Sequence, residues 1–154
     1  MADVRLLLIS RDDILRVMRQ GSGDNLFRPL ATLTRQGVHL LATAAQPEEW
    51  AGEHGSPDDA LLGPESIRKR LSDAGGTLDG VYYVRRSLLT QKRNREAALQ
   101  DILERYAIPP RACTLLSSHV KFVQAASRLG IHTSLLGPGS DLLEALSAMT
   151  RQAA

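Results

Sequence analysis

Short apolar runs alternate with amphipathic stretches along most of this chain. Residues 4–9 form the first run, which is apolar except for Arg5 and is typical of a strand in the buried middle of a parallel sheet. Residues 25–36 then repeat apolar side chains at helical spacing, with Leu26, Leu30 and Leu33 on one face. This alternation predicts an α/β fold, a Rossmann-like, doubly wound parallel sheet of about five strands.

The pattern also sets the expected order of the elements. Strands are expected at residues 4–9, 38–42, 81–84, 112–116 and 131–136. Helices are expected at residues 25–36, 64–74, 94–106, 119–129 and 141–149. Residues 16–24 and 48–62 contain several glycines, and we expect a flap over the sheet's edge and an exposed loop there. We expect one domain over residues 1–150 and a frayed end at residues 151–154.

Composition and charge narrow the class of protein only modestly. The 154 residues suffice for one domain with a buried core. No apolar run approaches the roughly 18 residues of a membrane helix, and the N-terminus lacks a signal-peptide pattern, so a cytoplasmic protein without membrane contact is expected. A net charge of +2 and 4% aromatic residues argue against a nucleic-acid partner. The single cysteine, Cys113, excludes an internal disulfide and is expected to be inert packing within a strand.

The candidate chemistry lies where predicted strands end and helices begin. The first strand runs into Ser10-Arg11-Asp12-Asp13-Ile14-Leu15, a hydroxyl followed by an acidic pair. Carboxylates at the carboxyl edge of a parallel sheet are a common way to hold Mg²⁺ against a phosphate. The second strand continues into Thr43, the helix after the third strand contains Lys92, and the fourth strand leads into Ser117-Ser118-His119-Val120-Lys121-Phe122.

Taken in order, these segments resemble the haloacid-dehalogenase (HAD) superfamily, and best its capless histidinol-phosphate and D,D-heptose-bisphosphate phosphatase branch. That family reads Asp-Arg-Asp-Gly-Val-Ile at the first strand, Thr-Asn-Gln at the second, and Lys-Pro-x-Pro-Gly-Met-Leu at the helix start. Its fourth segment, Val-Gly-Asp-Ser-x-x-Asp-x-x-Ala-Ala, aligns without a gap with residues 116–126. The resemblance covers nearly the whole chain and implies a HAD-like fold without a cap domain.

The departures from the family fall on the positions that the resemblance marks as catalytic. Ser10 replaces the nucleophilic aspartate, and Ser118 and Phe122 replace the two magnesium-binding aspartates, while Asp12 keeps the acid–base slot. Serine is a poor nucleophile without an adjacent base, and Mg²⁺ in such a site relies on carboxylates. We therefore expect a degenerate motif with no catalytic residue and no bound Mg²⁺. The branch's Cys/His zinc loop has no counterpart ligands in residues 85–91, so zinc is excluded.

The positions that bind phosphate in the family are better preserved in this chain than the positions that carry out its hydrolysis. Thr43 and Lys92 keep their positions, and a basic cluster lies close to Lys92 in the sequence. We expect Thr43, Lys92, Arg85, Arg86 and Arg93 to bind an anion, although these basic residues also fit a solvated surface loop. The lone Trp50 fits either packing at the edge of the core or an interface with a partner.

Three functions remain open from the sequence. The favoured one is a catalytically inactive HAD-like binding or regulatory module, with residual affinity for phosphate and with a phosphorylated small ligand or a protein as partner. The second is a divergent phosphatase of a small phosphorylated metabolite that uses Asp12 or Asp13 with a relocated metal. The third is a structural subunit of a protein complex. A response-regulator receiver is disfavoured, because Val84 at the end of the third strand is followed by Arg85 and not by an aspartate.

Overall fold

The computed structural model describes residues 4–21, 23–45, 67–84, 91–137 and 141–153. Its strands are β1 (Leu6–Ser10), β2 (His39–Ala45), β3 (Gly80–Val84), β4 (Cys113–Ser117) and β5 (His132–Leu135). Its helices are α1 (Arg11–Arg19), α2 (Gly23–Arg35), α3 (Ile67–Asp73), α4 (Gln91–Tyr106), α5 (Val120–Arg128) and α6 (Leu142–Ala153), with a 3₁₀ turn η3 at Pro110–Ala112. Each strand and helix expected from the sequence overlaps one of these elements.

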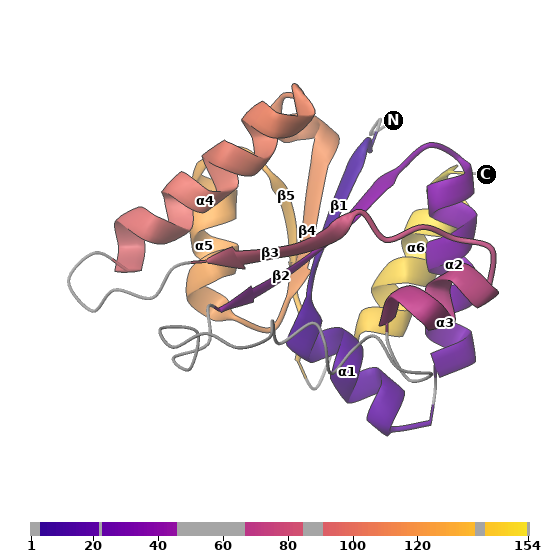
Figure 1. Ribbon diagram of the computed structural model, residues 1–154. Coiled ribbons are helices and arrows are strands. Elements are labelled where there is room, and N and C mark those ends of the chain that lie inside the picture. The colour runs from indigo at the N-terminus through magenta and orange to yellow at the C-terminus, as the bar shows by residue number, and fades with distance from the viewer. Residues whose placement is uncertain (1–3, 22, 46–66, 85–90, 138–140, 154) are drawn as a thin grey trace, which may run out of the picture.

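The five strands form one parallel sheet in the order β3-β2-β1-β4-β5. Figure 1 shows α4 and α5 on one face of the sheet and α2, α3 and α6 on the other. The register pairs Ser10 on β1 with Thr43 on β2, and Thr43 with Tyr82 on β3. The expected Rossmann-like α/β fold is confirmed, and its register brings the carboxyl ends of the central strands together at one edge.

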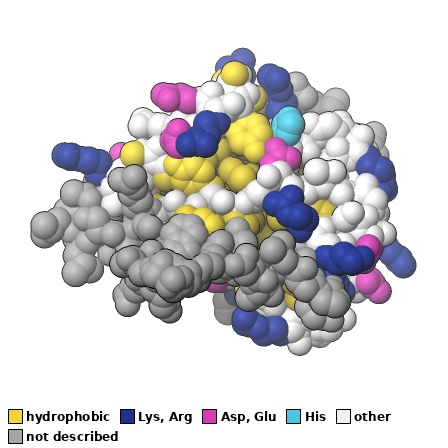
Figure 2. All heavy atoms as spheres, viewed as in Figure 1, with side chains coloured by type: hydrophobic (Ala, Val, Ile, Leu, Met, Phe, Trp, Pro, Cys, Tyr) yellow, Lys and Arg dark blue, Asp and Glu magenta, His cyan; other side chains and the backbone are white. Residues whose placement is uncertain are grey.

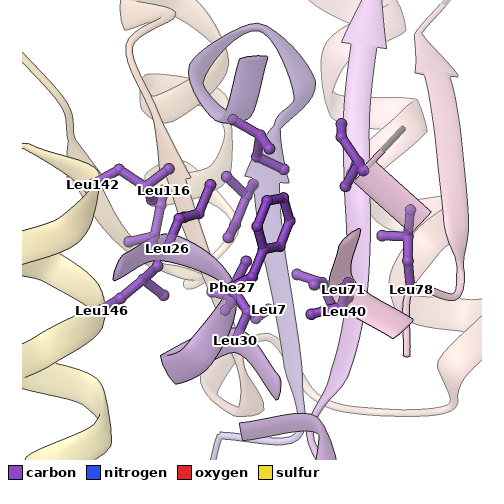
Figure 3. Close-up of a cluster of buried hydrophobic side chains, with 14 of the residues drawn as sticks. Leu7, Leu26, Phe27, Leu30, Leu40, Leu71, Leu78, Leu116, Leu142 and Leu146 are labelled. Carbon is purple, nitrogen blue, oxygen red and sulfur yellow. The ribbon is translucent and has the colours of Figure 1, made fainter. Parts of the chain in front are cut away.

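Alternate residues of β1, β2, β3 and β4 contribute to two separate apolar clusters, because successive side chains of a strand point to opposite faces. On β1, Leu7 and Ile9 pack with α2, α3 and α6, and Figure 3 shows this cluster. Leu6 and Leu8 pack on the other face, against α4 and α5. Ser10 follows Ile9, so it lies on the same face as Leu8, the face that α4 and α5 cover.

The segment after β1 differs from the expectation. We expected a turn and then a flap at residues 16–24, but α1 begins directly after Ser10 and continues to Arg19. Ile14 and Val17 are buried and three residues apart, which is helical spacing, and acidic residues in the first turn suit the helix dipole. The prediction of a flap was wrong, because it gave more weight to Gly21 and Gly23 than to this short helical repeat.

Three further findings concern the end of α6, the predictions that fall outside the described residues, and membrane-spanning helices. Helix α6 extends to Ala153, past the expected end of the helix at residue 149. Predictions for the loop at residues 48–62, for Trp50, and for Arg85 and Arg86 concern residues outside the described ranges. Within those ranges no helix is both long and apolar enough to cross a membrane.

Candidate anion-binding site

Three buried hydroxyls lie at or near the ends of three neighbouring strands, at the carboxyl edge of the sheet. Ser10 is 2% exposed and lies in register with Thr43, which is 4% exposed. Ser117 is fully buried and follows Leu116, the last β4 residue in register with β1. Strand alternation puts all three on the face covered by α4 and α5. The centre of this edge is therefore lined with neutral hydroxyl groups, where a metal-dependent phosphatase would present carboxylates.

Asp13 is the one fully buried carboxylate among the described residues, and its contacts are structural. Its Oδ2 accepts a hydrogen bond of 2.9 Å from the backbone N–H of Ser118. Its Oδ1 lies 2.8 Å from Nη2 of Arg16, one turn further along α1, as an ion pair without hydrogen-bond geometry. Asp13 thus ties the β1–α1 junction to the β4–α5 loop. A short acidic side chain that bonds a backbone N–H in this way fixes the local chain path.

Asp12 has a very different environment, although it is the next residue along the chain. Its side chain is 64% exposed, and its Oδ2 lies 3.6 Å from Nε2 of His119, whose side chain is 57% exposed. The two residues come from the β1–α1 and β4–α5 connections, so the fold brings them together. An exposed ion pair at this distance contributes little stability.

The fourth segment supplies a hydroxyl and an aromatic ring where the resemblance implies aspartates. Ser118 is partly exposed and uses its backbone N–H to bond Asp13. Phe122 is 7% exposed and packs into the cluster beneath α4 and α5. Ser117 Oγ accepts a 3.0 Å hydrogen bond from the N–H of His119 and so supports the turn into α5. These residues give the segment a structural role.

Arg11, the first residue of α1, was not singled out in the sequence. Its Nη1 donates a 3.1 Å hydrogen bond to the hydroxyl of Tyr83 on the edge strand β3, and its guanidinium carbon lies 5.6 Å from the centre of that ring. Since β2 lies between β1 and β3, the Arg11 side chain crosses the carboxyl end of β2. Figure 2 shows hydrophobic side chains gathered over β3 with lysine and arginine side chains around them.

The basic residues expected to bind an anion are only partly located. Lys92 is the second residue of α4, the helix that follows β3 and packs on the hydroxyl-bearing face. Arg93, in the same turn, has an exposed side chain. Arg85 and Arg86 lie outside the described residues. Anion binding by Lys92, the arginines and Thr43 therefore stays a prediction, and the register sets Thr43 beside Ser10.

The described residues do not form a donor set for Mg²⁺. No group of three histidine, cysteine or acidic side chains gathers within them. Both oxygens of Asp13 are engaged by Ser118 and Arg16, and Asp12 is left with His119 as its charged neighbour. A magnesium ion normally needs at least one or two carboxylates here, so we derive no step that uses a metal.

Cys113 lies in β4 and is fully buried. Burial raises the pKa of its thiol to about 12, so the thiol stays protonated at neutral pH and is a poor nucleophile. The expectation that Cys113 is inert packing agrees with this environment.

Three solved structures share this fold over most of the chain. D,D-heptose 1,7-bisphosphate phosphatase from B. bronchiseptica, complexed with magnesium and phosphate, is 16% identical, with 98% of this chain and 100% of that chain covered and a TM-score of 0.67. A predicted HAD-like family hydrolase from Porphyromonas gingivalis is 13% identical, with 97% and 99% covered and a TM-score of 0.54. An uncharacterized protein from Corynebacterium glutamicum is 20% identical, with 88% and 87% covered and a TM-score of 0.58.

No protein-family model and no curated protein matches the sequence. At identities of 20% and below, the structural likeness shows a shared fold. The chain therefore shares the fold of these solved structures, a HAD-like hydrolase and a heptose bisphosphate phosphatase among them, as the motif order implied. What it does with this fold has to be argued from its own residues.

Two features of the site were missed in the sequence, and one of them had a signal. Ser117 follows its apolar run at the same offset as Ser10, so strand alternation alone could have placed the two hydroxyls together. The contact of Arg11 with Tyr83 joins residues 72 positions apart and depends on β1 and β3 flanking β2. Nothing local in the sequence indicates that contact.

Proposed function

We propose that this protein is a non-catalytic, HAD-like binding module that holds the phosphate group of a small ligand. The observation that carries the proposal is the row of buried hydroxyls Ser10, Thr43 and Ser117 at the ends of the central strands. Hydroxyl groups donate hydrogen bonds to an oxyanion without adding negative charge that would repel it. The same edge of the sheet is where ligands of open α/β folds bind.

The absence of turnover in this proposal follows from the chemistry of the residues present. A phosphoenzyme requires an activated nucleophile, and no hydrogen bond joins the Ser10 hydroxyl to a basic side chain among the described residues. Asp13 is buried and fixed by Ser118 and Arg16, so it is not available to attack or to bind a metal. Asp12 is exposed, and an acid–base group alone accelerates nothing without a nucleophile to serve.

Binding is supported by donors that converge on this edge. The side chain of Ser10 makes no capping hydrogen bond to α1, so the first-turn N–H groups of that helix have no side-chain cap there. Such groups favour an anion. We expect Lys92, the second residue of α4, to add a positive charge at this edge.

A phosphate titration monitored by amide chemical shifts tests the proposal. The amides of Ser10 and Thr43 and those at the start of α4 should shift in a saturable way without added Mg²⁺. A charge-assisted contact contributes about 1.5–3 kcal/mol, so Lys92→Ala should weaken binding by about tenfold or more. Lys69→Ala is the matched control, because Lys69 lies on α3 and pairs with Asp73. Unchanged shifts at Ser10 and Thr43 would remove the proposed site.

A divergent phosphatase is the second candidate, and one observation favours it. Asp12 keeps the acid–base position and lies 3.6 Å from His119, which gives this edge one exposed pair able to move a proton. Hydrolysis of an aryl phosphate that needs Mg²⁺ and is abolished by Asp12→Asn would establish this candidate and exclude the first.

A further inference from the structure

Three charged side chains leave the β1–α1 junction, and two of them have charged neighbours. Asp13 pairs with Arg16, and Asp12 lies beside His119. Arg11 has no carboxylate within ion-pair distance among the described residues, and its contact with Tyr83 is to a neutral hydroxyl and a ring. The positive charge of Arg11 is therefore not neutralised by the part of the chain that the structure describes.

Three other arginines of the described chain pair with carboxylates. Arg16 pairs with Asp13 at 2.8 Å, Arg128 with Glu96 at 2.9 Å and Arg105 with Asp101 at 3.2 Å. These three side chains are 45–69% exposed, so water could also solvate them. Arg11 is less exposed than these three, and it is the one without a carboxylate. A partly buried charge is unfavourable unless a counter-charge or hydrogen bonds compensate it.

The free capacity of Arg11 lies on one edge of its guanidinium. Nη1 is used by Tyr83, whereas Nε is shielded from water and has no hydrogen-bond acceptor. Nε and Nη2 together form the edge of a guanidinium that takes two oxygens of a carboxylate or phosphate. An unmet buried donor is unfavourable, and an oxyanion on this edge would satisfy it.

The geometry points to Arg11 as an oxyanion-binding residue that takes a phosphate group at the ends of β1 and β2, with Tyr83 holding Nη1. The inference rests on the proposed function in that a phosphorylated ligand is the source of the oxyanion. It adds Arg11 to the binding residues and adds a second position at this edge of the sheet. Side chains alternate along β3, so Tyr83 lies on the face opposite to Thr43 and Tyr82. Since Nε is shielded, binding includes a small outward turn of the guanidinium while Nη1 stays at the Tyr83 hydroxyl.

Inorganic phosphate is the probe for this inference, with the Nε–Hε cross-peak of Arg11 as the direct readout. The cross-peak is assigned by its loss in Arg11→Lys and should shift as phosphate saturates. Arg11→Gln should weaken phosphate binding by about tenfold or more, since it removes a charge-assisted contact. Arg11→Lys keeps the positive charge but loses the planar pair of N–H donors. Its affinity for phosphate should lie between those of the unmodified protein and of Arg11→Gln. Arg128→Gln, which removes a guanidinium already paired with Glu96, should bind like the unmodified protein.

The outcomes separate this inference from the proposed function. If the amides of Ser10 and Thr43 shift with phosphate while the Arg11 cross-peak and the affinity of Arg11→Gln do not change, Arg11 is a structural bridge and the inference is wrong. If the unmodified protein shows no saturable shift, the proposed function fails as well. Acetate tests the ligand class, and tighter binding of acetate than of phosphate would contradict the assignment to phosphate. Thermal unfolding of Arg11→Lys verifies that the fold persists.

Discussion

The two edges of the sheet differ in the partners of their polar side chains. At the amino edge these side chains bond to one another, whereas at the carboxyl edge some lack a partner among the described residues. At the amino edge, Asp79 accepts a 2.7 Å hydrogen bond from Tyr106 and lies 3.0 Å from Nδ1 of His39. The rings of His39 and Tyr106 are 5.2 Å apart, so the three side chains form one closed cluster. At the carboxyl edge, Ser10 and Thr43 are buried hydroxyls, and Arg11 has no carboxylate partner among the described residues.

This difference separates support of the fold from capacity for a ligand. In the amino-edge cluster His39 and Tyr106 both bond to Asp79, so these side chains stabilise one another where β2 and β3 begin and α4 ends. The carboxyl edge holds donors whose partners are not supplied by the described chain. Donors with unmet capacity in a fold's ligand-binding region are what a binding site requires.

The largest loss of stability is expected on substitution of Asp13, which lies at the carboxyl edge and ties the β1–α1 junction to the β4–α5 loop. Asp13→Ala leaves the Ser118 N–H without its acceptor and should lower the free energy of unfolding by about 1–3 kcal/mol in urea denaturation. Asp13→Asn keeps an acceptor and should lose less. Asp12→Ala, at an exposed neighbour, should change stability by no more than about 0.5 kcal/mol. Equal losses at Asp12 and Asp13 would contradict the structural role given to Asp13.

The amino-edge cluster should show a measurable pH dependence. Tyr106→Phe removes one hydrogen bond and should lower the free energy of unfolding by about 0.5–1.5 kcal/mol near pH 7. Burial and the adjacent Asp79 raise the pKa of Tyr106 above its usual value of 10.0, so its contribution is complete below that pH and is lost as the pH rises further. The stability gap between the two proteins should therefore shrink in urea denaturations above about pH 10. A gap that widens would refute this account of Tyr106.

Substitution of Ala107, next to Tyr106, should give a smaller change in the free energy of unfolding, and one of opposite sign. Its φ is +53°, in the left-handed region, and it ends α4 with a hydrogen bond from Ile108 N to Leu103 O. Glycine tolerates this conformation better, so Ala107→Gly should raise the free energy of unfolding by roughly 0.5–1 kcal/mol. Ala97→Gly, at an exposed position inside the same helix, should lower it by about 1 kcal/mol. Thermal melts of the two variants should shift in opposite directions.

The sequence predicted the sheet well because its signal is local. Five apolar runs separated by helical repeats are enough to specify parallel strands with crossover helices, and all five strands formed. The error at α1 was also local. Ile14 and Val17 carried a helical signal over barely two turns, while Gly21 and Gly23 suggested an irregular flap. Short helices give few repeats, so turn-forming residues nearby can outweigh them.

The candidate site was only partly predictable, because its important contacts depend on strand order. The motif order put Ser10 and Thr43 in one expected site, and the register of β1 and β2 sets these two residues side by side. The environments of Asp12 and Asp13 could not be told apart in the sequence, since one residue of helical rotation makes one exposed and the other buried. The reach of Arg11 to Tyr83 depends on which strand lies beside β2, and no local pattern encodes that.

The smallest expected effect is none at all, in a variant that restores the family's nucleophile. Ser10→Asp should not hydrolyse an aryl phosphate with Mg²⁺, because Ser118 and Phe122 still replace the expected metal ligands. Circular dichroism verifies the fold of the variant. Turnover in this single variant would mean that another residue supplies the metal site, and the carboxyl edge would then be a catalytic edge one substitution away from activity.

The most direct test of the central claim is the hydrolysis of an aryl phosphate by the unmodified protein in the presence of Mg²⁺. A binding module predicts no turnover above the buffer rate, while inorganic phosphate still shifts the amides of Ser10 and Thr43 in a saturable way. Turnover that depends on Mg²⁺ and disappears in Asp12→Asn would contradict the account and identify the protein as a phosphatase.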